Sequence, residues 1–80
     1  MARRLYRPRP ATVAASADGV PERVGHGEVA SVREEWLVED RWWTARPLRR
    51  RYFELTMADG ANAVVFRDLE SDRWYTQRGA

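Results

Sequence analysis

The chain has 80 residues, enough for one small domain. It contains no cysteine and one histidine, which excludes a disulfide framework and any metal site within one chain that needs several thiolate or imidazole ligands. The net charge is only +2, and because all 14 positive residues are arginine, every cation can make bidentate contacts with phosphate or carboxylate.

The first ten residues carry four arginines and two prolines. Pro8 and Pro10 forbid a regular helix, so residues 1–10 are predicted to be a flexible basic arm that contributes nothing to folding. Residues 11–80 are predicted to form a single small domain. The start lacks the apolar core of a signal peptide, and no stretch approaches the roughly 18 apolar residues of a membrane span. These features predict a cytoplasmic protein without membrane contact.

Residues 11–27 mix valines with turn-forming residues. We predict one or two short strands joined at Asp18-Gly19, and a second turn where Gly25 and Gly27 flank His26. His26 is interpreted as a turn residue, because no supporting motif surrounds a Ser-His-Asp arrangement that would include it.

The next segment, EVASVREEWLVED, alternates between apolar and polar residues. Ala30, Val32, Trp36 and Val38 share one parity, which is typical of a half-buried strand. A helix is the alternative, since Val32, Trp36 and Glu39 also fall near one helical face. The valine and tryptophan content favours the strand.

The segment RRYFELTMADGANAVVFRD carries the clearest signal in the chain. Asp59-Gly60 between two alternating runs predicts a β-hairpin with a two-residue type I′ turn. Such a turn dictates which residues face each other, and Phe53 and Phe66 would be neighbours on one buried face. The cross-strand pairs that it predicts include Phe53 with Phe66, Arg51 with Asp68 as an ion pair, and Tyr52 with Arg67 as a ring–guanidinium contact.

A last strand is predicted in RWYTQR, after a turn at LESD. Two registers stay open: a four-residue loop sets Asp68 against Arg73, and a three-residue loop sets Phe66 against Trp74. The segments together predict an all-β fold, a small antiparallel meander of four to six strands that curls into an open barrel. Such a domain has little stability to spare, and a partner or a homodimer contact would help it.

Rings and guanidinium groups are concentrated in RWWTARPLRRRYFEL. Pro47 cannot donate to a ladder, so TARPL is predicted to connect two strands, which leaves few side chains for a partner surface. The candidate residues for binding a protein partner or nucleic acid are Trp42, Trp43, Arg46, Arg49 and Arg50. Three interpretations stay open: ordinary packing, a protein-binding face, and a single-stranded nucleic-acid surface on which arginines contact phosphates and rings stack on bases.

The motifs PERV, EEW, RWW, RRRYFEL, DG, VVFRD and RWY follow one another between Pro21 and Tyr75. In this order and spacing they resemble the C-terminal segment of ImuB-type proteins, the inactive Y-family polymerase homologues of bacterial translesion synthesis, and small stand-alone actinobacterial proteins of uncharacterised function. The resemblance implies a bacterial cytoplasmic interaction module that contacts replication or repair proteins. It supplies no catalytic residue, and no nucleophile, metal set or phosphate loop is recognisable, so neither an enzyme nor a cofactor is expected.

Overall fold

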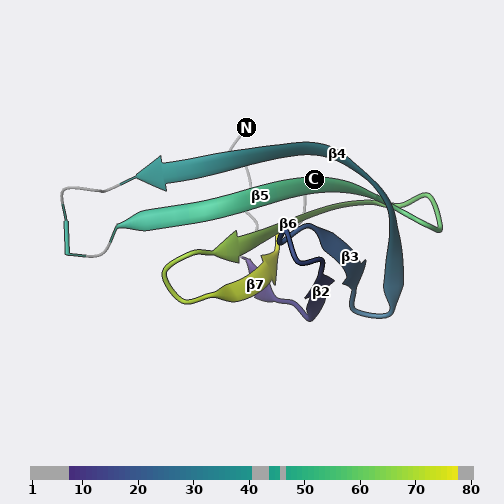
Figure 1. Ribbon diagram of the computed structural model, residues 1–80, viewed down its shortest axis with the longest axis horizontal. Helices are drawn as coiled ribbons and strands as arrows, with labels where there is room; N and C mark the ends of the chain where they lie inside the picture. Colours follow the sequence, from purple (N-terminus) through teal and green to yellow (C-terminus); the bar gives the residue numbers. More distant parts are fainter. Residues whose placement is uncertain (1–7, 41–43, 46, 78–80) are drawn as a thin grey trace, which may run out of the picture.

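The computed structural model describes residues 8–40, 44–45 and 47–77, in which all regular structure is β-strand. Seven strands form one antiparallel sheet in the order β1-β7-β6-β5-β4-β3-β2, which confirms the all-β prediction with more strands than the four to six expected. Their bounds are β1 Arg9–Pro10, β2 Val13–Ala15, β3 Pro21–Val24, β4 Gly27–Asp40, β5 Leu48–Met57, β6 Asn62–Asp68 and β7 Arg73–Thr76. The sheet curls into an open half-barrel, and Figure 1 shows β2, β3 and β7 gathered below the long β4–β5 pair.

The first strand lies within the segment that was predicted to be a free arm. Arg9 and Pro10 form β1 and pair with Thr76 and Tyr75 of β7. Pro10 is tolerated because β1 is an edge strand, where a missing N–H need not break a ladder bond. The end of the predicted arm therefore belongs to the sheet, and residues 1–7 lie outside the described residues.

The turns predicted in the first third of the chain are confirmed. The β2–β3 turn contains Asp18 and Gly19, and Gly19 adopts a φ of 81° while its N–H donates to the Ser16 carbonyl at 2.9 Å. Gly25 and His26 form the turn that leads into β4. The strand interpretation of the following segment is also confirmed, because β4 runs without a helix from Gly27 to Asp40.

The β5–β6 hairpin turns at Asp59-Gly60, but not through the predicted type I′ geometry. A type I′ turn needs a positive φ at both central residues, and here only Gly60 has one, at 91°. The Gly60 N–H donates to the Met57 carbonyl at 2.9 Å, and the Met57 N–H donates to the Ala61 carbonyl at 2.8 Å. These bonds describe a three-residue connection, a turn over residues 57–60 that ends in a left-handed glycine bulge.

That extra residue shifts the hairpin register by one position. The observed pairs are Phe53 with Val65, Tyr52 with Phe66, Arg51 with Arg67 and Arg50 with Asp68. Because side chains alternate with a period of two, the shift moves partners to opposite faces. The predictions that Phe53 faces Phe66, that Arg51 pairs with Asp68 and that Tyr52 contacts Arg67 are therefore wrong.

Both phenylalanines are nonetheless buried, on different faces of the sheet. The inner face, enclosed by the curl, holds Phe53, Leu55 and Val65 at 0% exposure. Partly buried residues pack against this core: Val20, Val24, Val29, Met57, Ala63 and Trp74. The short β2–β3 hairpin thus supplies apolar cover for the inner face of the longer strands.

The outer face carries a row of four rings on four adjacent strands. This aromatic row consists of Trp36, Tyr52, Phe66 and Tyr75. Successive ring centroids lie 5.3, 4.9 and 5.2 Å apart, close to the spacing between neighbouring strands. Phe66, in the middle of the row, is only 1% exposed. Among the described residues, the neighbouring rings and the Arg50 guanidinium shield Phe66 on this face.

The register of the last strand follows the four-residue alternative, with Asp68 opposite Arg73. The Asp68 carboxylate accepts the N–H groups of Glu70 and Ser71 at 2.8 and 3.2 Å. Asp72 completes the loop in the left-handed region with a φ of 63°. Asp68 thus stabilises the loop between β6 and β7.

The hairpin geometry predicts the effect of removing Gly60. Gly60→Ala should lower the free energy of unfolding by about 1–2 kcal/mol, because a Cβ at a φ of 91° is strained although no atom lies within 4 Å of it. Gly60→Asn should cost less, since asparagine tolerates the left-handed region. Urea titration followed by tryptophan fluorescence measures both. Equal stability of Gly60→Ala and the parent would contradict the bulge.

Candidate functional site

Three of the five candidate residues, Trp42, Trp43 and Arg46, lie outside the described residues. The strands on either side of them are described. β4 ends at Asp40 and β5 begins at Leu48, so the described residues Thr44, Ala45 and Pro47 of TARPL lie between two strands as predicted, whereas Leu48 belongs to β5.

The other two candidates, Arg49 and Arg50, do not form one surface. They are consecutive in β5, so their side chains point to opposite faces. Arg49 pairs with Glu39 at 3.1 Å and with Glu70 at 3.6 Å. The Arg50 guanidinium lies 4.5 Å from the centroid of the Phe66 ring, and its Nε is buried without a hydrogen-bond partner among the described residues. Both side chains are thus engaged within the domain.

Carboxylates also occupy other arginines of the described part of the chain. Arg51 Nε donates to Glu35 at 2.6 Å, and Arg51 Nη1 donates to the backbone carbonyl of Asp18 at 3.1 Å. The remaining ion pairs join Arg67 to Asp72 and Arg23 to Glu28. Exposed pairs of this kind contribute roughly 0–1 kcal/mol each to stability. Their larger consequence is that these guanidinium groups already have anionic partners.

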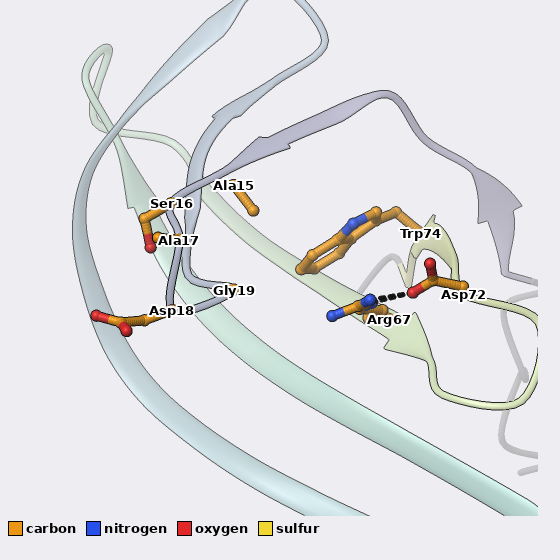
Figure 2. A pocket seen from close by; sticks show the side chains of 8 residues that line it. All are labelled: Ala15, Ser16, Ala17, Asp18, Gly19, Arg67, Asp72 and Trp74. Carbon is orange, nitrogen blue, oxygen red and sulfur yellow. Dashed lines mark hydrogen bonds and ion pairs between the residues drawn. The ribbon is translucent and has the colours of Figure 1, made fainter.

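A hollow of about 400 Å³ lies between the β2–β3 turn and the ends of β6 and β7. Figure 2 shows Trp74, Arg67 and Asp72 on one side of it and the turn over residues 15–19 on the other. Its main polar groups already have partners: Arg67 bonds to Asp72, and the Ser16 hydroxyl accepts the Val20 N–H at 3.2 Å. The hollow therefore offers few unpaired groups to a ligand.

Among the described residues, the longest stretch of strand backbone without a pairing strand on one side is the outer edge of β4. β3 pairs with β4 only at Gly27 and Glu28, so the rest of this 14-residue strand has β5 on one side and no described strand on the other. In Figure 1 this edge runs along the top of the sheet. Register shifts near Ala30 and Arg33 bend the first half of β4, whereas residues 34–40 pair regularly with residues 48–54.

Alternation along the strands shows which backbone groups this edge presents. The Arg49 carbonyl accepts the Leu69 N–H at 2.9 Å, so the polar groups of Arg49 point toward β6. Those of Arg50 and Tyr52 then point toward β4, where they bond the partners Val38 and Trp36. The alternate β4 residues direct their N–H and C=O groups away from the sheet, and these are Glu35, Leu37 and Glu39.

Apolar side chains accompany these outward backbone groups. Leu37 is 54% exposed, Trp36 38% and Val32 37%. A long edge strand with exposed apolar residues is a template for pairing with another chain. The sequence does contain a related signal, the acidic residues Glu34, Glu35, Glu39 and Asp40, since charges of this kind are common on edge strands. Without the strand order, that signal could not be assigned to an edge.

Comparison of the chain with family models, curated proteins and solved structures found no match. Within residues 8–40, 44–45 and 47–77, no group of three or more histidine, aspartate or glutamate side chains could hold a metal ion. The same residues contain no helix long and apolar enough to cross a membrane.

Proposed function

We propose that this domain is a non-enzymatic protein-interaction module whose binding element is the outer edge of β4. The observation that carries the proposal is the regular segment over residues 34–40, which presents outward backbone groups together with the exposed side chains of Trp36 and Leu37. An added strand would satisfy the backbone groups of this edge, and its alternate side chains would contact Trp36 on one face and Leu37 on the other.

The arginines support a protein partner over single-stranded nucleic acid. A nucleic-acid surface needs guanidinium groups that can reach phosphates and ring faces on which bases can stack. Arg49 and Arg51 are paired with carboxylates, and Arg50 lies on Phe66. Within the aromatic row, Trp36 and Tyr52 are nearly parallel, with 7° between their planes, so they turn ring faces toward each other.

The class of partner follows from the resemblance to ImuB-type tails. That resemblance supports a replication or repair protein of bacterial translesion synthesis, met in the cytoplasm. An extended, apolar and basic segment of such a protein would complement the acidic side chain of Glu34, which is exposed on the same face as Trp36.

Replacing Leu37 with proline tests this function. The Leu37 N–H points away from β5, so Leu37→Pro should leave the fold intact and remove a donor from the binding edge. We expect the tagged variant to lose, in co-purification from bacterial cells, the proteins that the parent chain retains. Leu37→Val is the matched control, because it keeps the N–H and the apolar character and should retain them.

Salt separates the two classes of partner. Retention through an apolar strand interface should survive high salt, whereas binding of a single-stranded oligonucleotide through arginines should weaken steeply. If Leu37→Pro folds, as judged by its melting temperature, and still retains every partner of the parent, β4 is not the binding element. Tight oligonucleotide binding by both variants would favour the nucleic-acid alternative.

A further inference from the structure

We infer that the outer edge of β4 pairs with the same edge of a second copy of this chain, giving a symmetric dimer whose twofold axis passes beside Trp36. This inference rests on the proposed function, because it names one occupant of the same edge. In a symmetric dimer the surface must complement itself, so each β4 residue can be tested against the residue that the symmetry sets opposite it.

Charge favours centring this pairing on Trp36 over centring it on either neighbouring residue. Antiparallel strands that continue one sheet, with the same face upward, must be centred on a single residue. Centring on Trp36 sets Glu35 opposite Leu37 and Glu34 opposite Val38 of the second copy, so no two like charges of the regular segment face each other. Centring on Glu35 places that carboxylate against itself, and centring on Leu37 sets Glu35 against Glu39. Like charges directly opposite are destabilising, so the Trp36 register is favoured.

The backbone directions agree with the same register. Glu35 and Leu37 both direct their N–H and C=O groups outward, and the Trp36 register sets them opposite each other, as a hydrogen-bonded pair requires. The backbone N–H and C=O groups of Trp36 point toward β5, so the two Trp36 residues form a non-hydrogen-bonded pair. Side chains approach most closely in such pairs, which suits two large rings.

Both faces gain from this arrangement. On the outer face, the 38% exposed Trp36 ring would meet its own copy, and the aromatic row would run unbroken from one Tyr75 to the other. On the inner face, the 54% exposed Leu37 would lie over the stem of Glu35, whose carboxylate is already held by Arg51 at 2.6 Å. The second copy therefore covers two of the three large apolar residues that the described part of the monomer leaves exposed, Trp36 and Leu37.

The small core gives the domain a reason to associate. Among the described residues, the only large apolar side chains that are fully buried are Phe53, Leu55, Val65 and Phe66. Domains of this size bury a limited share of their surface, and oligomerisation is one of the usual compensations.

Cysteine scanning tests the dimer and its register together. The natural chain has no cysteine, so a single substitution reports on one position. Across a non-hydrogen-bonded pair the Cα atoms lie about 4.5 Å apart, which is within the range of about 4.4–6.8 Å for disulfides. Trp36→Cys should oxidise to a covalent dimer. Val38→Cys is the matched control on the same face: its two copies would lie about 14 Å apart along the strands, and they should not cross-link.

Charged substitutions at position 37 provide a second test, in which sedimentation equilibrium measures the dissociation constant of the dimer. Leu37→Glu would face Arg51 within its own sheet, so the fold should tolerate it, but it would oppose Glu35 of the second copy. Because the symmetric dimer contains that pair twice, its dissociation constant should rise roughly tenfold to thirtyfold. Leu37→Arg should keep the dimer. Asn62→Glu, at the far end of the hairpin, is the control and should also keep it.

If the parent chain is monomeric at all accessible concentrations, the proposed dimer is wrong. This holds whether the edge is then bound by a different protein or by the chain's own basic N-terminal segment. Cross-linking through Val38→Cys instead of Trp36→Cys overturns the register and with it the inference. These outcomes are separable from those of the proposed function. If the parent chain is a monomer and Leu37→Pro loses the co-purified partners, the proposed interaction module still holds. If the parent chain is a dimer and Leu37→Pro retains those partners, only the interaction module is overturned.

Discussion

Phe53→Ala should lower the free energy of unfolding by about 3–5 kcal/mol, a large share of the stability of so small a domain. Phe53 is 0% exposed and lies at the centre of the inner core, with the Trp74 ring centroid 5.8 Å away and the Arg51 guanidinium 4.9 Å from its own ring. Truncating a buried phenylalanine costs about 3–5 kcal/mol. At about 0.05–0.15 kcal/mol per residue, a chain of this length has roughly 4–12 kcal/mol to lose.

Urea titration with circular dichroism measures this effect without relying on the tryptophan that Phe53 contacts. Leu37→Ala is the control, because it also removes a large apolar side chain but from a 54% exposed position. It should change stability by no more than about 0.5 kcal/mol in the monomer. Similar losses for the two variants would show that the inner face is not the main core.

Phe66→Ala should destabilise the domain by a comparable amount, about 3–5 kcal/mol, although it lies on the opposite face. Its ring is packed between Tyr52 and Tyr75, and the Arg50 guanidinium lies 4.5 Å from its centroid. The loss should include a ring–guanidinium contribution of about 0.5–2 kcal/mol. A one-sided sheet would predict a much smaller effect at this position.

A double-mutant cycle separates the parts of that loss. Phe66→Leu keeps most of the apolar volume and should cost less than Phe66→Ala, while it removes the ring that Arg50 contacts. Combining each Phe66 variant with Arg50→Met should therefore reveal a coupling energy, meaning that the loss of stability in the double variant differs from the sum of the two single losses. If the Phe66 and Arg50 changes are additive, the guanidinium contributes nothing through the ring, and the aromatic row is simply apolar packing.

The location of the exposed β4 edge could not be predicted from the sequence. Charge makes Arg49 and Arg50 candidates in the sequence, yet Arg49 is held by carboxylates and Arg50 is half-buried on a ring. Whether a strand is an edge depends on the order of the strands, and neighbours in the sheet need not be neighbours in sequence, as β1 and β7 show. The acids of β4 are visible in the sequence, but they are equally typical of any solvent-facing strand.

Local chemistry determined the elements of this fold. Asp18-Gly19, Gly25-His26 and Asp59-Gly60 mark turns because glycine adopts a positive φ at little cost, and the alternating runs between them are strands. The tertiary structure alone decided which face each strand residue occupies. The hairpin at Asp59-Gly60 could close with two residues or with three, and the two closures place Phe53 and Phe66 on the same face or on opposite faces. Neighbouring residues such as Tyr52 and Phe53 both carry aromatic side chains, so the alternation of apolar and polar residues could not show which of them faces the inner core. Packing on both faces of the sheet decided it.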